Sequence, residues 1–528
     1  MEKDNPAPEW AAALQGRPPL SGPAGASTGS NHEPGSDNRN STGLRESNSH
    51  QEHYIAMLNR QVGIGLILVF GAAALALRAQ SPEEKVQQDE KIQKLEQKID
   101  ALEQRVQADE SKKKTQDEAI QADESKKKKT QDEAGADKSK SKSNTTVSAD
   151  TSGFKIQSAD GDYLLKIGAD LQVDDRTFLG DGSSALPDTI VLRRVRPTFS
   201  GTIYKYFDYM FRPDFGLGQT VIYDAYLECT YFSSANLRVG KFKPPVGLER
   251  LQSDDDTNFV ERGLPTLLAP SRDIGYQLSG NLLQKRIYYA VGVFNGVPDN
   301  GLSDSAASDH RDFAGRIFLT PFLPATGNPL RGLGFGVGAS DGSDSNIALP
   351  NYKTFGQNSF VTFQTGVASA GHRTRLAPQA YYYLGPFGLL SEYTLAEEGI
   401  QKGTVRRNIA FRAWQAQATF ILTGERKSFT GLTPKRSFDP RNHGWGAVEL
   451  AARVGEFVAE RGVYSYGLMD PTKSARLAHE WVGGVNWYLN RLLRISLDYG
   501  RTSFEGGAVN GNRPTEKAII TRFQINFI

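Results

Sequence analysis

Residues 517–528, KAIITRFQINFI, decide the fold, because their pattern predicts the last strand of the chain. One face of this strand is apolar apart from a threonine and carries Ile519, Thr521, Phe523, Ile525 and Phe527. The other face is more polar and carries Ile520, Arg522, Gln524 and Asn526. Successive side chains of a strand point to opposite faces, so this period of two predicts one apolar and one wet side. Outer-membrane barrels commonly end in such an amphipathic strand with a terminal aromatic, although here Ile528 follows the phenylalanine.

The same alternation recurs upstream, for example in VIYDAYLECTY (221–231) and LRISLDYG (493–500). A soluble β-sandwich would turn its polar faces to water, whereas an outer-membrane barrel turns its apolar face to lipid and its polar face to a lumen. Aromatic residues near segment ends, as in YKYFDYMF (204–211), YYYLGPF (381–387) and WVGGVNWYLN (481–490), favour the barrel, since Tyr and Trp gather at membrane interfaces. We therefore predict an all-β fold, a transmembrane antiparallel β-barrel over residues 154–528, and its length suits sixteen strands.

Composition argues against several other classes of protein. The formal charge of +2 creates no basic field for nucleic acid, and the single cysteine, Cys229, excludes a disulfide framework. The barrel region has four scattered histidines, in no recognisable catalytic motif and in no pair that suggests a metal site: His310, His372, His443 and His479. We therefore predict neither an enzyme nor a bound cofactor.

The first 150 residues differ from the barrel region in composition and pattern. Residues 1–56 are rich in Gly, Pro, Ser and Asn, so they should be disordered, and translation from Met57 would leave them out of the protein. Residues 57–79 indicate a signal peptide, because Arg60 precedes an uncharged run of 16 residues that is short for a bilayer span and ends in small residues. An uncleaved anchor is the alternative.

Residues 80–150 predict a short coiled coil followed by a charged spacer. The seam of the coil consists of Ile92, Leu95, Ile99, Leu102 and Val106, at alternating spacings of three and four. After it, QADESKKK occurs at 107 and again at 121 without core positions, which is typical of a solvated helical or disordered spacer. So short a coil would support an association made elsewhere rather than set the number of chains.

Several ordered segments resemble the phosphate-selective porin O and P family. NLRVGKFKPPVGLERLQSD (236–254) resembles its entry to an inward-folded loop, and FVERGLPTLLAPSRDIGYQLSG (259–280) resembles the stretch that follows. HGWGAVELAARV (443–454) and VGGVNWYLNRLLRISLDYG (482–500) resemble its two C-terminal signatures. IVLRRVRPTFSGTIYKYFDYMFRPDF (190–215) resembles an early hairpin, so the likeness covers essentially all of residues 154–528.

This resemblance implies a sixteen-stranded porin of the outer membrane of a Gram-negative-type bacterium, usually a homotrimer. Its lumen would be narrowed by an inward loop and lined by arginines and lysines that pass small anions, phosphate or polyphosphate among them. The expected partners are therefore such anions, outer-membrane lipid and further copies of the chain, with periplasmic or cell-wall contact through the coiled coil. A non-selective general porin and a structural barrel that tethers the envelope stay open as alternatives.

Arginine is the preferred cation of the barrel region, with 29 arginines but 12 lysines from residue 151 onward. Its planar fork of donors suits oxyanions, although a genomic preference for arginine would give the same bias. In VLRRVRPTFSGT (191–202), alternation turns Arg194 and Arg196 towards the lumen. It puts Arg193 on the lipid side, where an interfacial position is required because an arginine at the midplane costs about 2–4 kcal/mol.

The other candidates follow from alternation or from the predicted loop. Alternation turns Arg212, Arg238, Arg494 and Arg522 inward, whereas Pro244 and Pro245 break the strand near Lys241 and Lys243, and the two parities conflict around Arg412. We predict an anion pathway lined by Arg194, Arg196, Arg212, Arg238, Lys241, Lys243, Arg250, Arg262, Arg272, Arg494 and Arg522.

Acidic residues accompany these cations. Five of them could pair with inward arginines: Asp208, Asp214, Asp224, Glu228 and Asp498. The run SDDDTN (253–258) is awkward for an anion pore, and we expect it to be solvated, with loop capping or binding of a divalent cation as alternatives.

Overall fold

A computed structural model describes residues 145–150, 153–180, 186–306 and 309–527. The predicted disordered stretch and signal peptide lie outside the described residues, as does nearly all of the predicted coiled coil and spacer. The last residues of that spacer, however, form strand β1 (Thr146–Asp150), so regular structure begins before the predicted barrel boundary.

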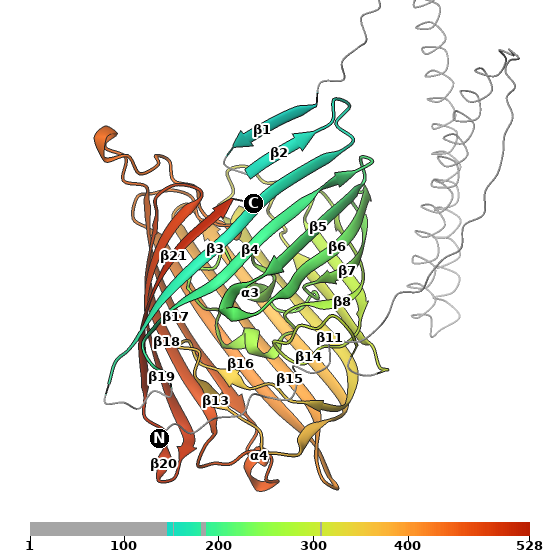
Figure 1. Cartoon of the computed structure of the whole chain (residues 1–528), viewed down its shortest axis with the longest axis vertical. Coiled ribbons are helices and arrows are strands. Elements are labelled where there is room, and N and C mark those ends of the chain that lie inside the picture. The colour runs from blue at the N-terminus through green and yellow to red at the C-terminus, as the bar shows by residue number, and fades with distance from the viewer. Residues whose placement is uncertain (1–144, 151–152, 181–185, 307–308, 528) are drawn as a thin grey trace, which may run out of the picture. The chain divides into compact units, whose positions relative to one another are not determined.

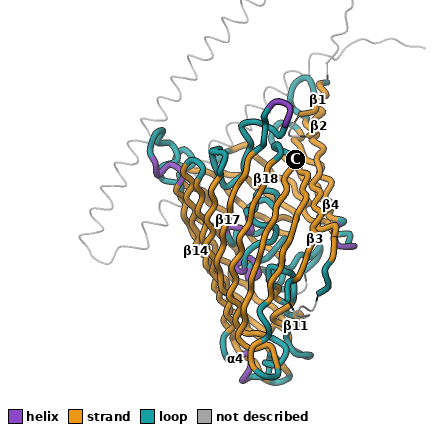
Figure 2. The backbone as a smooth tube through the Cα atoms, turned by 90° about the vertical axis from the view of Figure 1, so that its left-hand side faces the viewer, coloured by secondary structure: helices purple, strands orange, loops and turns teal. Residues whose placement is uncertain are grey.

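Sixteen antiparallel strands form a closed barrel, as predicted (Figures 1 and 2). In chain order they are β3 (Leu164–Phe178), β4 (Thr189–Ile203), β5 (Phe207–Asp214), β6 (Val221–Phe232), β7 (Ala235–Phe242), β8 (Asp273–Leu282), β9 (Ile287–Phe294), β10 (Asp312–Leu319), β11 (Leu333–Ala348), β14 (Val367–Leu384), β15 (Phe387–Lys402), β16 (Val405–Ile421), β17 (Ala447–Ala459), β18 (Ala475–Tyr488), β19 (Leu493–Ala508) and β21 (Glu516–Phe527). Each pairs with its neighbour in the chain, and β21 closes the ring on β3, with Phe523 opposite Val173. Closure leaves the barrel wall without a free edge.

Short elements complete the described chain. β1 pairs with β2 (Gly153–Gln157), and β2 pairs with the first residues of β3, next to the end of β21. The others are the strands β12 (Tyr352–Lys353), β13 (Ser359–Val361) and β20 (Gly511–Asn512), the helices α3 (Leu248–Leu251) and α4 (Gly462–Ser465), and the 3-10 turns η2 (Gly216–Gly218), η3 (Leu264–Leu268), η4 (Pro329–Gly332) and η5 (Pro440–Asn442). None of the helices in the described residues is long and apolar enough to cross a membrane.

The connection between β7 and β8, residues 243–272, folds into the barrel (Figure 1). We call it the inward loop. Pro244 and Pro245 end β7, since proline cannot donate to the strand ladder. The loop reaches the far wall, where Arg453 of β17 donates to the Glu261 carbonyl at 2.8 Å and the Val260 N–H donates to Asp498 of β19 at 2.7 Å. It therefore spans the lumen.

Part of the interior is apolar. Leu264 and Leu268 of the inward loop pack with Tyr352 and Phe360 around β12 and β13. The wall contributes inward-facing apolar residues to this cluster, including Ile409, Phe411, Ala413 and Phe457. This apolar plug explains the conflicting parities around Arg412, which is exposed on the outer face of β16 while its apolar neighbours point inward.

Candidate functional site

A β-bulge in β4 brings an additional arginine into the lumen. Arg194 lies opposite Gln172 of β3, but Leu192 lies opposite the next residue, Val173, so Arg193 has no partner in the ladder. Arg193 therefore points inward, and its Nε lies 2.7 Å from Glu261 Oε1 on the inward loop. The prediction that Arg193 faces the lipid interface is wrong, because the bulge shifts the alternation by one residue.

A second bulge, in β6, turns Tyr223 inward. Arg212 of β5 lies opposite Asp224, but Pro213 lies opposite Ile222, which leaves Tyr223 as the extra residue. The Tyr223 ring is sandwiched by cations, with guanidinium carbons 3.7 Å and 3.6 Å from its centroid. These belong to Arg196 and Arg272. Strict alternation in VIYDAYLECTY (221–231) places Tyr223 on the outward apolar face with Ala225 and Leu227. This prediction is wrong, so the strand pattern misses a residue of the site.

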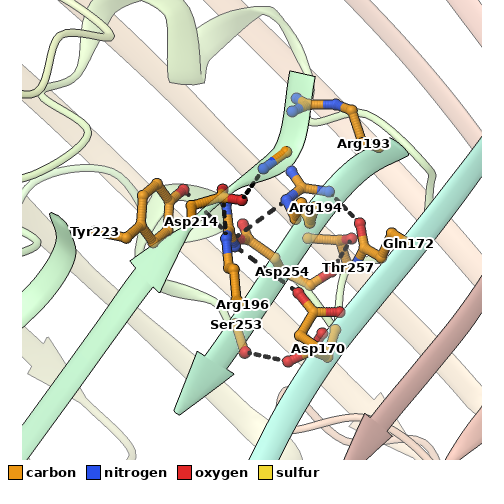
Figure 3. Close-up of polar contacts among 12 residues, drawn as sticks. Asp170, Gln172, Arg193, Arg194, Arg196, Asp214, Tyr223, Ser253, Asp254 and Thr257 are labelled. Carbon is orange, nitrogen blue, oxygen red and sulfur yellow. Dashed lines mark hydrogen bonds and ion pairs between the residues drawn. The ribbon is translucent and has the colours of Figure 1, made fainter. Parts of the chain in front are cut away.

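Asp254 of the inward loop is the hub of the arginine cluster (Figure 3). Its carboxylate accepts hydrogen bonds from Arg196 and Arg262, and the Nε of Arg194 lies 3.6 Å away. Burial alone would raise the pKa of Asp254, but Arg262, Arg194 and Arg196 hold it well below its ordinary value. The acidic run is thus not solvated at Asp254, because three arginines replace water there.

Four of the predicted pathway residues line one cavity of about 220 Å³, which we call the Arg250 cavity. They are Arg194, Arg196, Arg250 and Arg262, and the cavity also receives Arg193 and Lys353. Only two carboxylates, Asp214 and Glu261, are among the described lining residues. The cavity therefore has six cationic side chains against two anionic ones.

Arg250 differs from its neighbours in its partners. It donates to the Thr266 carbonyl and, at 2.6 Å, to Asn300 Oδ1. Burial, and then the charge of Arg262, lower its pKa to about 10, so the guanidinium stays protonated at neutral pH. Within the described residues it has no carboxylate within 4 Å, which leaves its charge free to attract an anion.

Four other predicted residues line a second cavity of about 240 Å³, the Arg238 cavity: Arg212, Arg238, Lys243 and Arg272. Arg272 Nε and Arg212 Nη1 share Asp224, at 3.2 Å and 3.6 Å, and Asp224 is the one carboxylate among the described lining residues. Tyr223 lines the first cavity and its ring contacts Arg272 of the second, so these two stacked side chains lie between the cavities.

Lys243 lies in the inward loop where it meets the Arg238 cavity. Its ammonium donates to the carbonyl of Gln252 at 2.7 Å. Burial, followed by the nearby Arg272 and Arg262, lowers its pKa well below the ordinary value for lysine. Lys243 therefore lies between the Arg238 cavity and the backbone of the inward loop.

Three predicted residues line neither cavity. Arg494 and Arg522 point inward as predicted but are buried in contacts, Arg522 Nε with Asp174 at 2.6 Å and Arg494 with the Thr257 carbonyl at 3.0 Å. Arg522 therefore links two strands of the wall, and Arg494 links the wall to the inward loop. Lys241 is buried and its Nζ lies 2.6 Å from Asp304, so the structure does not bring it to the other candidates.

Three of the five predicted acidic partners pair with arginines. Asp214 lies 2.7 Å from Arg196 Nε, Glu228 lies 2.7 Å from Arg238, and Asp224 holds the pair described above. The other two make different contacts, because Asp208 accepts from the Thr202 hydroxyl and Asp498 binds loop backbone. In the described part of the chain, no group of three or more His, Cys, Asp or Glu side chains could hold a metal ion.

The chain is similar to several known proteins. The chain is 25% identical to Porin O of Pseudomonas aeruginosa over 415 residues, which cover 71% of this chain and 91% of that protein. Among solved structures it is similar to the outer membrane channel DcaP of Acinetobacter baumannii, with 8% identity, coverage of 68% and 97% of the two chains and a TM-score of 0.46. The anion-selective porin from Comamonas acidovorans matches with 10% identity, coverage of 69% and 99%, and a TM-score of 0.43.

The model of a known protein family matches most of the barrel. The model of that family, phosphate-selective porin O and P, matches residues 165–527, from the first strand of the ring to the last. The chain therefore belongs to the phosphate-selective porin O and P family and is a β-barrel porin of the outer membrane.

Proposed function

We propose that this porin passes small anions, phosphate among them, by way of the Arg250 and Arg238 cavities. The observation that carries the proposal is the excess of six cationic over two anionic side chains around the Arg250 cavity. The description of the family, phosphate-selective porin O and P, supports the same function. The activity we infer is passive conduction without chemical change of the anion.

The arrangement suits transit rather than tight binding. A conducted ion needs donors close enough to replace part of its hydration, yet spread so that it can leave each site. Asp254 neutralises part of the charge of three arginines, whereas Arg250 is left without a carboxylate partner in the described chain. An anion attracted by Arg250 therefore has further cationic donors beside it and, past Tyr223, those of the second cavity.

Anion conduction can be tested by recording chloride currents in planar bilayers while phosphate is added. We expect phosphate to reduce the chloride current of the wild-type protein at millimolar concentration. The substitution Arg250→Gln should weaken this block by about tenfold, because a charge-assisted hydrogen bond in a desolvated site contributes about 1.5–3 kcal/mol.

The matched control is Lys285→Gln, which removes one positive charge in the exposed turn between β8 and β9. It should leave the block unchanged. Equal effects of both substitutions, or a chloride current that phosphate does not alter, would support the general porin instead. A folded protein without any conductance would support the structural barrel.

We also propose that the protein assembles as a homotrimer through the side of the barrel formed by β5 to β10. The strands β5, β7, β9 and β10 have 8 residues each, whereas a tilted strand needs about 9–11 residues to cross a bilayer. Strands too short to cross the bilayer suit contact with another protein better than contact with lipid. The number three comes from the family resemblance. The mass of the detergent-solubilised protein, measured by light scattering, should equal three chains, and the mass of one chain would contradict the proposal.

A further inference from the structure

Three side-chain oxygens without a hydrogen-bond partner belong to neighbouring residues beside the arginine cluster. They are Oδ1 of Asp170 in β3, Oδ1 of Asp255 in the inward loop and Oδ1 of Asn526 in β21, and all three atoms are buried. A buried oxygen that accepts no hydrogen bond costs about 1–3 kcal/mol, and more if it is charged. Three of them in one place point to a ligand that all three share.

The register of the wall and the contacts of the loop bring the three residues together. Asn526 lies directly opposite Asp170 in the β21–β3 ladder. The Asp255 carboxylate lies close enough to the Asp170 carboxylate for their like charges to repel each other. Asp255 and Asn526 line the same cavity of about 290 Å³, which we call the Asp255 cavity, and Gln524 donates to the Asp255 carbonyl at 3.4 Å.

The neighbouring cations are committed elsewhere. Arg196 Nη1 is 3.9 Å from Asp170 Oδ2, but Arg196 makes closer contacts to Asp214 and Asp254. Neither Asp255 nor Asp256, which lines the same cavity, has a basic side chain within 4 Å in the described chain. Arg212 and Arg491 also line this cavity, but within the described residues neither forms an ion pair with Asp170 or Asp255, and Arg212 pairs with Asp224. Two carboxylates side by side without a close counter-charge of their own are unfavourable unless a cation is bound.

We propose that Asp170, Asp255 and Asn526 bind a divalent hard cation, with Ca²⁺ preferred over Mg²⁺. Carboxylate and amide oxygens are the ligands that Ca²⁺ takes, and the cavity has room for the waters that complete its coordination. The donors come from three separate elements, and the flexible coordination of Ca²⁺ tolerates such a set better than the strict octahedron of Mg²⁺.

A cation at this place would have two effects. It would fasten the inward loop to β3 and β21, because its ligands come from both. It would also offset negative charge in the Asp255 cavity. Arg212 lines both this cavity and the Arg238 cavity of the proposed anion pathway. The binding itself does not depend on anion conduction, so its test is independent of the proposed function.

Calcium binding can be measured by isothermal titration of the full-length, detergent-purified protein after treatment with EDTA and dialysis. We expect one Ca²⁺ per chain. The single substitutions Asp170→Asn and Asp255→Asn should each weaken binding by about tenfold or more, since each removes a charged ligand. The matched control is Asp175→Asn, which removes an exposed carboxylate from the outward face of the same strand, β3, and should leave binding unchanged.

Folding of each variant is checked by its heat-dependent migration in gels. If an aspartate variant does not fold, Asn526→Ala removes the uncharged side-chain amide, and with it one proposed oxygen ligand, and should also weaken binding. The proposal is wrong if the wild-type protein binds no Ca²⁺ up to about 10 mM. In that case water would satisfy the three oxygens. It is equally wrong if folded Asp255→Asn or Asn526→Ala binds Ca²⁺ as the wild type does.

Discussion

At the residue scale, the buried carboxylate of Asp254 organises the arginines. Its side chain is 4% exposed and contacts Arg194, Arg196 and Arg262. The stretch SDDDTN does not reveal that Asp254 is buried, because its hydrogen-bond partners Arg196 and Arg262 are 58 and 8 residues away in the chain. Sequence reasoning predicted most of the arginines of the site, and it missed the acidic group and the ring that hold them together.

Replacing Asp254 by Asn should destabilise the barrel by about 3–5 kcal/mol, because buried guanidinium groups lose their shared counter-charge. The pKa of Asp254 is lower in the folded protein than in the unfolded chain, where it is about 3.9. Its stabilising effect is therefore fully present above this value and is lost as the pH falls through the lowered folded pKa. The difference in unfolding free energy between wild type and variant should be constant from about pH 8 to pH 5 and shrink below about pH 4.

Denaturant titration in detergent measures this difference. The control is Asp208→Asn, whose carboxylate accepts from a threonine hydroxyl and has no arginine partner among the described ion pairs. A variant of Asp254 as stable as that control would show that the cluster does not depend on the shared carboxylate.

Tyr223 offers a second prediction at this scale. Its ring stacks on Arg196 and Arg272, and each cation–π contact contributes about 0.5–2 kcal/mol. Tyr223→Phe keeps the ring and should keep the anion-to-cation permeability ratio near that of the wild type. Tyr223→Leu removes the ring and should lower the ratio several-fold, because both arginines lose their position. Equal ratios for the two variants in bilayer recordings would remove Tyr223 from the account.

At the scale of the element, two bulges build the site. The sequence carries a trace of both: Ile190 and Leu192 are out of phase with Val195, and Ile222 is out of phase with Ala225. In each strand the outward apolar positions slip by one residue where the bulge occurs. Strict alternation therefore predicts the strands and most inward residues, and it fails where the register shifts.

Gly216 tests the bulge in β4. A Cβ on this residue would lie 2.6 Å from the carbonyl oxygen of Arg193 and 3.0 Å from the Cα of Arg194, both of them backbone atoms. Gly216→Ala should therefore displace the bulge and lower the permeability ratio for anions while the barrel still forms. The control is Gly483→Ala, where a Cβ meets no atom within 4 Å. Unchanged selectivity in folded Gly216→Ala would show that the bulge does not set the position of the arginines.

At the scale of the whole molecule, the sequence predicts the barrel better than its contents. Sixteen strands follow from the length and the period of two, because lipid imposes an apolar outer face on every strand. The filling of the lumen does not follow, since the inward loop and the apolar plug join residues far apart in the chain, such as Leu264 and Phe457. The plug fills part of the lumen, and the two cationic cavities lie beside β4 to β8.

The proposed route through the Arg250 and Arg238 cavities should favour anions over cations, and the reversal potential in a KCl gradient measures this preference. The wild-type protein is inserted into a planar bilayer with KCl about tenfold more concentrated on one side, and the voltage of zero current is measured. We predict a reversal potential with the sign of the chloride equilibrium potential, because the cations around the Arg250 cavity outnumber the carboxylates. A reversal potential of zero, or one with the sign of potassium, would contradict the account.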